Sequence, residues 1–163
     1  MRIFPVTLGL LIAQPLFAQE SVPEMPRQSA SLEIFGSGLT YTLNYERFFY
    51  REPRFAIGLR TGAGFTPPQM TWAPACGLIG VTALWGMDGE YLELGASHVV
   101  LFDRFRGTGI SMASFLIGYR YQPAPKGILF RAAFTPFYAP SRNPENGTMS
   151  LFPYAGFSVG YAF

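Results

Sequence analysis

Bulky and small side chains alternate along most of the chain after residue 30. In residues 39–49 ("LTYTLNYERFF"), Leu and Tyr occupy every second position, and Thr, Asn and Glu stand between them. A period of two places successive side chains on opposite faces of a β-strand. The pattern therefore predicts strands with one bulky face and one face of small or polar residues. It recurs in residues 39–49, 54–65, 78–85, 90–102, 114–121, 128–137 and 151–163.

An eighth strand is predicted for residues 30–35 ("ASLEIF"), followed by Gly36-Ser37-Gly38. The bulky positions change parity there, from Leu32 and Ile34 to Leu39 and Tyr41. A tight turn explains this change, and so does a glycine bulge within one long strand. We favour the turn, because single-chain bacterial barrels have even numbers of strands.

The connections between these strands alternate in length. The short ones read "REP", "GMDG" and "QPAPKG", and the longer ones read "PPQMTWAPA", "DRFRGTG" and "APSRNPENG". Outer-membrane barrels have short periplasmic turns and longer outer loops. In a closed barrel the last strand pairs with the first, so the apolar strand ending at Phe163 has no free edge.

Composition supports a membrane barrel over a soluble sandwich. The chain is 17% aromatic and 13% charged, against about 25% charged residues in a typical soluble domain. No later stretch is apolar enough for a transmembrane helix. The sequence thus predicts an all-β, eight-stranded, antiparallel up-and-down transmembrane β-barrel, with its bulky face toward lipid and its small face toward a narrow lumen.

The first residues predict export. A basic start, an apolar run and Ala18 before Gln19-Glu20 are typical of a signal peptide over residues 1–18. Residues 19–29 are polar and rich in proline, and predict a flexible leader before a barrel over residues 30–163. The expected location is the bacterial outer membrane.

Charge and metal-ligand counts argue against several partners. Removal of residues 1–18 lowers Lys+Arg from 12 to 11 and leaves 10 Asp+Glu, a net charge of +1. This gives no electrostatic reason to expect nucleic acid. The single Cys76 and single His98 argue against a metal site. We expect no metal and no cofactor.

Five charged residues fall on the small face of the predicted strands. Charges in a narrow lumen are costly unless they are paired, so we predict a lumenal ion-pair network. Its members are Glu46, Arg60, Glu93, Arg120 and Arg131. The network is interpreted as a polar plug that fills the barrel; a selectivity ring in a narrow pore for small solutes is the alternative.

A hydrolase site is a further alternative. Glu93, Ser97 and His98 are the residue types of a serine hydrolase, and some small outer-membrane barrels modify lipid. Alternation separates them, however, with Glu93 and Ser97 on the lumen face and His98 on the other face. No "GxSxG" motif is present, so we expect no catalytic residues, and we expect His98 near the outer membrane interface.

Aromatic residues predict the membrane boundary. Trp and Tyr gather at membrane interfaces, and the candidates for that position are Trp85, Tyr119, Tyr121, Tyr161 and Phe163. Trp72 lies in a long connection, where a membrane girdle does not require it. It is therefore the candidate for a loop interaction with a partner.

Several segments resemble a family of small, uncharacterised outer-membrane β-barrel proteins of Gram-negative bacteria. They are "LTYTLNYERFF", "YLELGAS", "IGYRYQP", "LFRAAFTPF" and "PYAGFSVGYAF". The closing strand, with Tyr161 and Phe163, is similar to the signal that such barrels present to the barrel-assembly machinery, although Ser158 stands where Gly is common. The resemblance implies a barrel but no activity. The expected partners are outer-membrane lipid and that machinery, and the expected role is structural or interactive.

Overall fold

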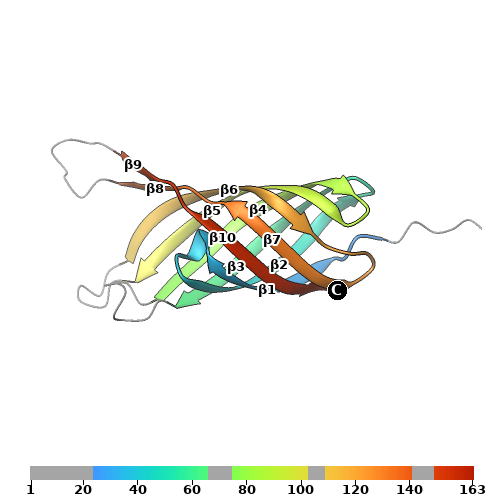
Figure 1. Cartoon of the computed structure of the whole chain (residues 1–163). Coiled ribbons are helices and arrows are strands. Elements are labelled where there is room, and N and C mark those ends of the chain that lie inside the picture. The colour runs from blue at the N-terminus through green and yellow to red at the C-terminus, as the bar shows by residue number, and fades with distance from the viewer. Residues whose placement is uncertain (1–23, 66–74, 103–108, 141–148) are drawn as a thin grey trace, which may run out of the picture.

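Ten β-strands and one 3₁₀ turn make up the computed structural model, which describes residues 24–65, 75–102, 109–140 and 149–163 (Figure 1). The elements are β1 (Gln28–Phe35), η1 (Gly36–Gly38), β2 (Tyr41–Glu52), β3 (Phe55–Phe65), β4 (Ala75–Met87), β5 (Glu90–Phe102), β6 (Gly109–Tyr121), β7 (Gly127–Phe134), β8 (Phe137–Pro140), β9 (Met149–Phe152) and β10 (Ala155–Ala162). No helix in the described ranges could span a membrane.

The strands close into an eight-stranded antiparallel barrel. Each strand from β1 to β6 pairs with the next one along the chain, and β10 pairs with both β7 and β1. β7 and β8 form one barrel strand, interrupted at Thr135 and Pro136, and β9 and β10 form another, interrupted at Pro153 and Tyr154. Proline lacks the N–H that continuous pairing needs. The predicted fold class is therefore confirmed.

The first strand is separate and is not one half of a bulged strand. β1 pairs with β2 through a register that includes Leu32 opposite Leu43. The turn between them uses positive φ angles at Phe35, Gly36 and Leu39. Its alternation with Tyr41 predicted that Leu39 lies on the outer face. This prediction is wrong, because the Leu39 side chain packs against a cluster of buried residues inside the barrel.

Alternation places large apolar side chains outside and polar side chains inside. Along β2, Tyr41, Leu43 and Tyr45 are exposed, whereas the intervening Thr42 and Asn44 are buried. The register of β2 with β3 shifts between Phe48 and Tyr50, so the chain has a β-bulge there. Across the barrel this arrangement gives an apolar exterior and a polar interior.

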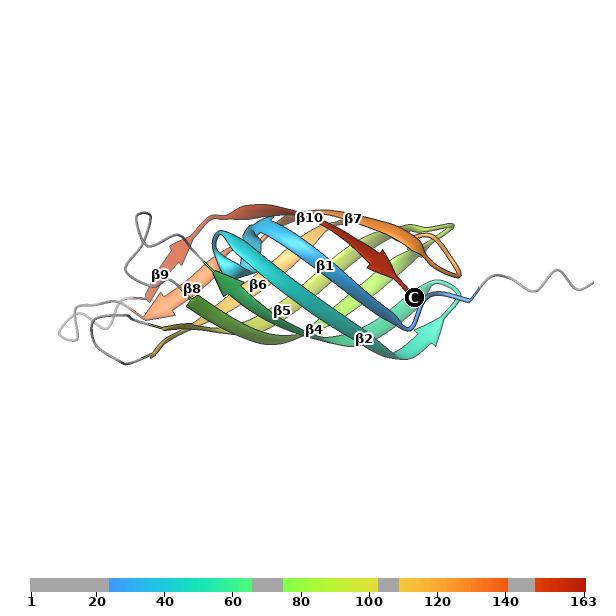
Figure 2. The same ribbon diagram turned by 90° about the horizontal axis from the view of Figure 1, so that it is seen from below.

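The barrel has two distinct ends (Figure 2). We call the end with the short turns at residues 53–54, 88–89 and 122–126, together with Phe163, the turn end. The opposite end, where β3 and β5 stop at Phe65 and Phe102, is the loop end. The predicted signal peptide and Trp72 lie outside the described residues. β1 begins at Gln28, within the segment predicted as a leader.

Candidate functional site in the barrel lumen

Four charged side chains meet in the middle of the lumen. The Arg120 Nη1 atom lies 2.5 Å from Glu46 Oε2 and 3.6 Å from Glu93 Oε1. The Arg131 Nη1 atom lies 3.2 Å from Glu46 Oε1 and 2.9 Å from Glu93 Oε1. Each carboxylate therefore contacts both guanidinium groups, and the four residues come from β2, β5, β6 and β7. The structure thus brings together four of the five residues of the predicted network.

Arg60, the fifth residue, belongs to a second cluster. Its Nη2 atom donates to Glu33 Oε2 at 2.5 Å, and its Nε atom donates to Asn44 Oδ1 at 3.2 Å. Asn44 Nδ2 in turn donates to Glu33 Oε2 at 3.2 Å. Asn44 therefore orients both members of the ion pair.

Glu33 was not among the predicted site residues. It lies between Leu32 and Ile34 in β1, and these neighbours are exposed while Glu33 is 1% exposed. The same alternation that identified Glu46 could have identified Glu33. With it, the buried charged side chains of the described ranges are three acids and three arginines, which balance: Glu33, Glu46, Glu93, Arg60, Arg120 and Arg131.

Neutral side chains complete the hydrogen bonding of the central arginines. Arg120 donates from Nη2 to Ser29 Oγ at 3.0 Å and from Nε to Gln122 Oε1 at 2.8 Å. Its guanidinium carbon also lies 5.3 Å from the centre of the Phe48 ring, a cation–π distance. Arg131 donates from Nε and Nη2 to Ser158 Oγ. Such partners offset the cost of removing the guanidinium groups from water.

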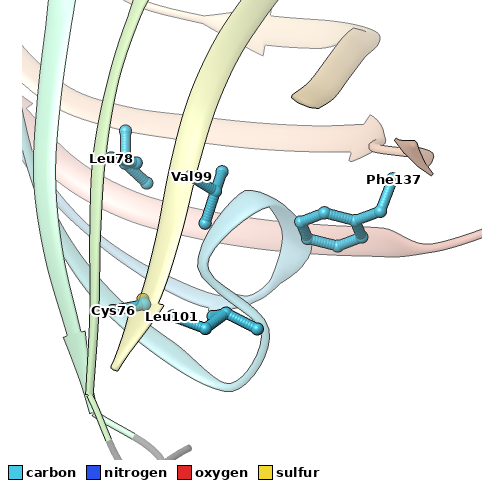
Figure 3. Close-up of a cluster of buried hydrophobic side chains, with 5 residues drawn as sticks. All are labelled: Cys76, Leu78, Val99, Leu101 and Phe137. Atoms are coloured by element: carbon cyan, nitrogen blue, oxygen red, sulfur yellow. The ribbon is translucent and has the colours of Figure 1, made fainter. Parts of the chain in front are cut away.

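A cluster of buried apolar side chains, which we call the apolar plug, lies in the lumen toward the loop end (Figure 3). Its buried members are Cys76, Leu78, Val99, Leu101 and Phe137. The turn η1 folds into the barrel beside them, which buries Gly36, Ser37 and Gly38. The plug is thus built from β4, β5 and β8 together with the first turn of the chain.

Hydrogen bonds hold η1 inside the barrel. The Cys76 thiol donates to the Gly38 carbonyl oxygen at 3.2 Å, and the Tyr154 hydroxyl donates to the Leu39 carbonyl oxygen at 2.8 Å. Ser114 Oγ lies 3.4 Å from Ser37 Oγ. The backbone of a turn placed in a lumen needs such partners. Gly and Ser at residues 36–38 were a signal of a turn, but nothing in their sequence indicated that it would point inward.

A second apolar cluster lies toward the turn end. Met25, Phe48, Ala56, Leu84 and Tyr91 form it, and all five are buried. Met25 precedes β1, and the chain next to it is fixed because the Phe48 N–H donates to the Arg27 carbonyl oxygen at 2.8 Å. The lumen of the described structure is therefore filled in three layers: apolar, charged and apolar.

The predicted interface aromatics all lie on the outer surface near the turn end. Trp85, Tyr119 and Tyr121 belong to β4 and β6, and Tyr161 and Phe163 stand at the end of the chain; all five are exposed. In the barrel register, Trp85 lies opposite Leu92, which lies opposite Tyr119. They form part of an aromatic band around this end of the barrel.

The residues of the hydrolase alternative do not meet. Glu93 is buried in the lumen, whereas His98 is exposed on the outer surface. His98 Nε2 instead lies 3.1 Å from Ser111 Oγ of the neighbouring strand. No group of three metal-ligating side chains gathers within residues 24–65, 75–102, 109–140 and 149–163.

The fold and the lumen together define a class: an eight-stranded β-barrel of the outer-membrane type, with an apolar exterior and a filled interior. No family model and no curated protein sequence matches this chain. Among solved structures, it is similar to the N-terminal β-barrel domain of Pseudomonas aeruginosa OprF, with 16% identity and a TM-score of 0.52. The match covers 83% of this chain and 95% of that one. The likeness shows the barrel fold alone, and no comparison shows the particular family of small barrels.

Proposed function

We propose that this protein is an integral outer-membrane barrel with a self-filled lumen and a structural or interactive, non-catalytic role. The observation that carries the proposal is that large apolar side chains face outward and charged side chains face inward, the reverse of a water-soluble protein. Side chains such as Leu43, Trp85 and Phe157 are about two-thirds exposed on the outer wall, while Arg120 and Glu93 are fully buried. Contact of these apolar side chains with water would be unfavourable, whereas lipid acyl chains around a closed barrel would cover them.

The filled lumen favours a structural role over a pore. An eight-stranded barrel has an interior that side chains just fill. Here the apolar plug, the charged layer and the second apolar cluster, which contains Met25, occupy successive levels of the lumen. A conducting pathway would require all three layers to rearrange.

The closing strand supports assembly by the barrel-assembly machinery. The Gln28 N–H donates to the Phe163 carbonyl oxygen at 2.9 Å, and the Phe163 N–H donates back to Gln28 at 2.8 Å. Because both ends of the barrel meet at this seam, a factor that handles the last strand would also control closure. The outer surface of the barrel would contact membrane lipid.

Fractionation of cells and heat-dependent gel mobility test the proposal. The protein is expected in the outer-membrane fraction, and the folded barrel is expected to migrate differently before and after boiling. A water-soluble monomer recovered without detergent would contradict the proposal. Stable single-channel currents would favour a pore, and changed acylation of lipid A on deletion would favour an enzyme.

A further inference from the structure

β8 and β9 extend beyond the barrel wall at the loop end, and we call this pair of strands the outer ribbon (Figure 1). Among the described residues, β8 pairs with β6 only at Ala113 and Ser114. β6 itself continues to Gly109 in pairing with β5, so the outer ribbon leaves the wall at this level. Successive side chains of a strand point to opposite faces, yet Leu151 and Phe152 are both more than half exposed. In the described structure, neither face of β9 is therefore packed against the barrel.

One edge of β9, which we call the open edge, has no strand partner in the described ranges. On one side β9 pairs with β8, and β9 stands last in the order of strands. On the other side β1 stops short of it. β1 pairs with β10 only as far as Phe35 opposite Gly156, and the chain then turns inward at η1. The ladder between β1 and β10 thus ends where the open edge begins.

Hydrogen bonds on both sides of this strand show which backbone groups face the open edge. Residues of an antiparallel pair alternate between those that bond each other and those whose N–H and C=O groups point away. The Thr135 N–H donates to the Tyr154 carbonyl oxygen at 2.7 Å, and Leu151 follows in the same register at an odd number of positions. On the β1 side, Phe163 bonds Gln28 and lies an even number of positions from Leu151. Both routes place the N–H and C=O groups of Leu151 at the open edge.

The open edge lacks most of the features that protect exposed edges. Natural sheets cover such edges or place charged residues and proline on them. The outer ribbon reads "FYAP" in β8 and "MSLF" in β9, without a charged residue. Proline occurs at Pro140 of β8 and at Pro153, beyond the end of β9, so the N–H of Leu151 stays available. An uncharged edge of this kind is a template for another strand.

We propose that the open edge binds an extended segment of another protein outside the cell, which adds to β9 as a further strand. This inference deepens the proposed interactive role and rests on it, because it places the loop end outside the membrane. Backbone hydrogen bonds would supply most of the affinity. Apolar side chains at every second position of the partner would lie beside the exposed Leu151. The partner segment is therefore extended, uncharged and alternately apolar.

A second copy of this chain fits the open edge less well. Two identical edges pair only antiparallel, because parallel pairing joins opposite edges and β8 holds the other edge of β9. Two copies in one membrane have the same orientation, and the outer ribbon points away from the turn end, in the general direction of the barrel axis (Figure 1, Figure 2). Their β9 strands would thus point the same way. A segment of a different protein has no such constraint.

Peptide binding tests the inference. The full barrel is refolded into lipid nanodiscs, and a fluorescein-labelled peptide of alternating Thr and Val is added, with empty nanodiscs as the background. Fluorescence anisotropy is expected to show binding that saturates below about 1 mM. The same peptide with N-methyl groups on adjacent residues, which block both of its edges, is expected to bind about tenfold more weakly. Absent binding, or equal binding of the two peptides, would overturn the inference.

Leu151→Pro is the decisive variant, because it removes the N–H at the open edge and leaves the bonds between β9 and β8 in place. It is expected to weaken peptide binding about tenfold. Leu151→Ala is the matched control, since it keeps this N–H, and it is expected to bind within about threefold of the wild type. Equal loss in both variants would assign the binding to the side chain and overturn the inference. Unchanged binding by Leu151→Pro would overturn it as well.

Cross-linking in isolated outer membranes, followed by mass spectrometry, tests for a second copy at the open edge. No cross-linked dimer is expected. A dimer that is lost in Leu151→Pro would assign the open edge to a second copy and overturn the inference. If the inference fails in a barrel with heat-dependent gel mobility, the proposed function stands. A chain that does not enter the membrane overturns both.

Discussion

Ser37 and Ser114 are 77 positions apart in the sequence, yet their hydroxyl oxygens lie 3.4 Å apart, and each residue is only 1% exposed. The contact places the first turn of the chain inside the barrel, against β6. The lumen near the loop end is therefore occupied by backbone as well as by side chains. Backbone packing of this kind leaves little room for change at the neighbouring glycines.

Gly156→Val is expected to destabilise the barrel by about 3 kcal/mol, as overpacking against rigid backbone does. A Cβ atom at Gly156 would lie 2.6 Å from Gly36 Cα, so η1 would have to leave its position. Gly77→Val is the control, since a Cβ there would meet only the Phe102 ring at 3.9 Å. Guanidinium unfolding in detergent measures both variants. Similar midpoints would contradict the inward position of η1.

Glu33→Ala is expected to cost about 3–5 kcal/mol, because it leaves the buried Arg60 without its carboxylate partner. The double change Glu33→Ala with Arg60→Met removes the charge as well, and is expected to recover much of that loss. The temperature at which the folded barrel loses its distinct gel mobility ranks the variants by stability. If the destabilisation of the double variant equals the sum for the two single variants, the two residues are not coupled.

Arg120→Ala is expected to lower the unfolding temperature in detergent without opening a conductance. It removes the 2.5 Å contact with Glu46 and the bonds to Ser29 and Gln122, at a cost of about 3 kcal/mol. The apolar layers on both sides of Arg120 stay in place. Planar-bilayer recordings and thermal melts check the two parts, with the exposed Lys126→Ala as control. If the Arg120→Ala variant conducts ions and the wild type does not, Arg120 blocks a conducting pathway through the lumen.

Met25→Ala is expected to destabilise the barrel by about 2 kcal/mol, since it removes a buried side chain from the cluster with Phe48 and Tyr91. The neighbouring Glu24→Ala, whose side chain is exposed, is expected to change stability little. Limited proteolysis near Arg27 is expected to be faster only in the first variant. Equal cleavage rates would indicate that Met25 does not hold the chain at the turn end.

His98→Leu is expected to leave the barrel folded and at least as stable in lipid. His98 and Ser111 are exposed on the outer wall, where the exposed Ile79 lies opposite His98. A polar side chain gains little from contact with acyl chains, and leucine suits that position better. Unfolding in vesicles measures the effect. A clear loss of stability would assign the His98–Ser111 pair a structural role.

The architecture could be predicted from the sequence because alternation shows which side chains lie on opposite faces of a strand. It identified the strands, the outward Trp85 and the inward Arg120, which lie on opposite faces of the wall. Even the ambiguous segment at residues 30–35 was assigned correctly, from the rule that these barrels have even strand numbers.

The arrangement within the lumen was less accessible. Alternation says that Arg60 and Arg120 point inward but not which acid each one meets, because that depends on the tilt and stagger of the strands. Glu33 was overlooked although it follows the same rule. The inward fold of η1 and the burial of Met25 arise from packing between segments far apart in sequence, which local pattern does not encode.

The pairing of β1 with β10 has a consequence for biogenesis. Ser29 of β1 lies opposite Ala162 of β10, so the seam joins residues that are 133 positions apart in the sequence. Contacts over such separations form slowly, because a long loop must close before they stabilise anything. Until β10 has been made, this seam cannot close, and β1 keeps an unpaired edge that is open to pairing with other chains.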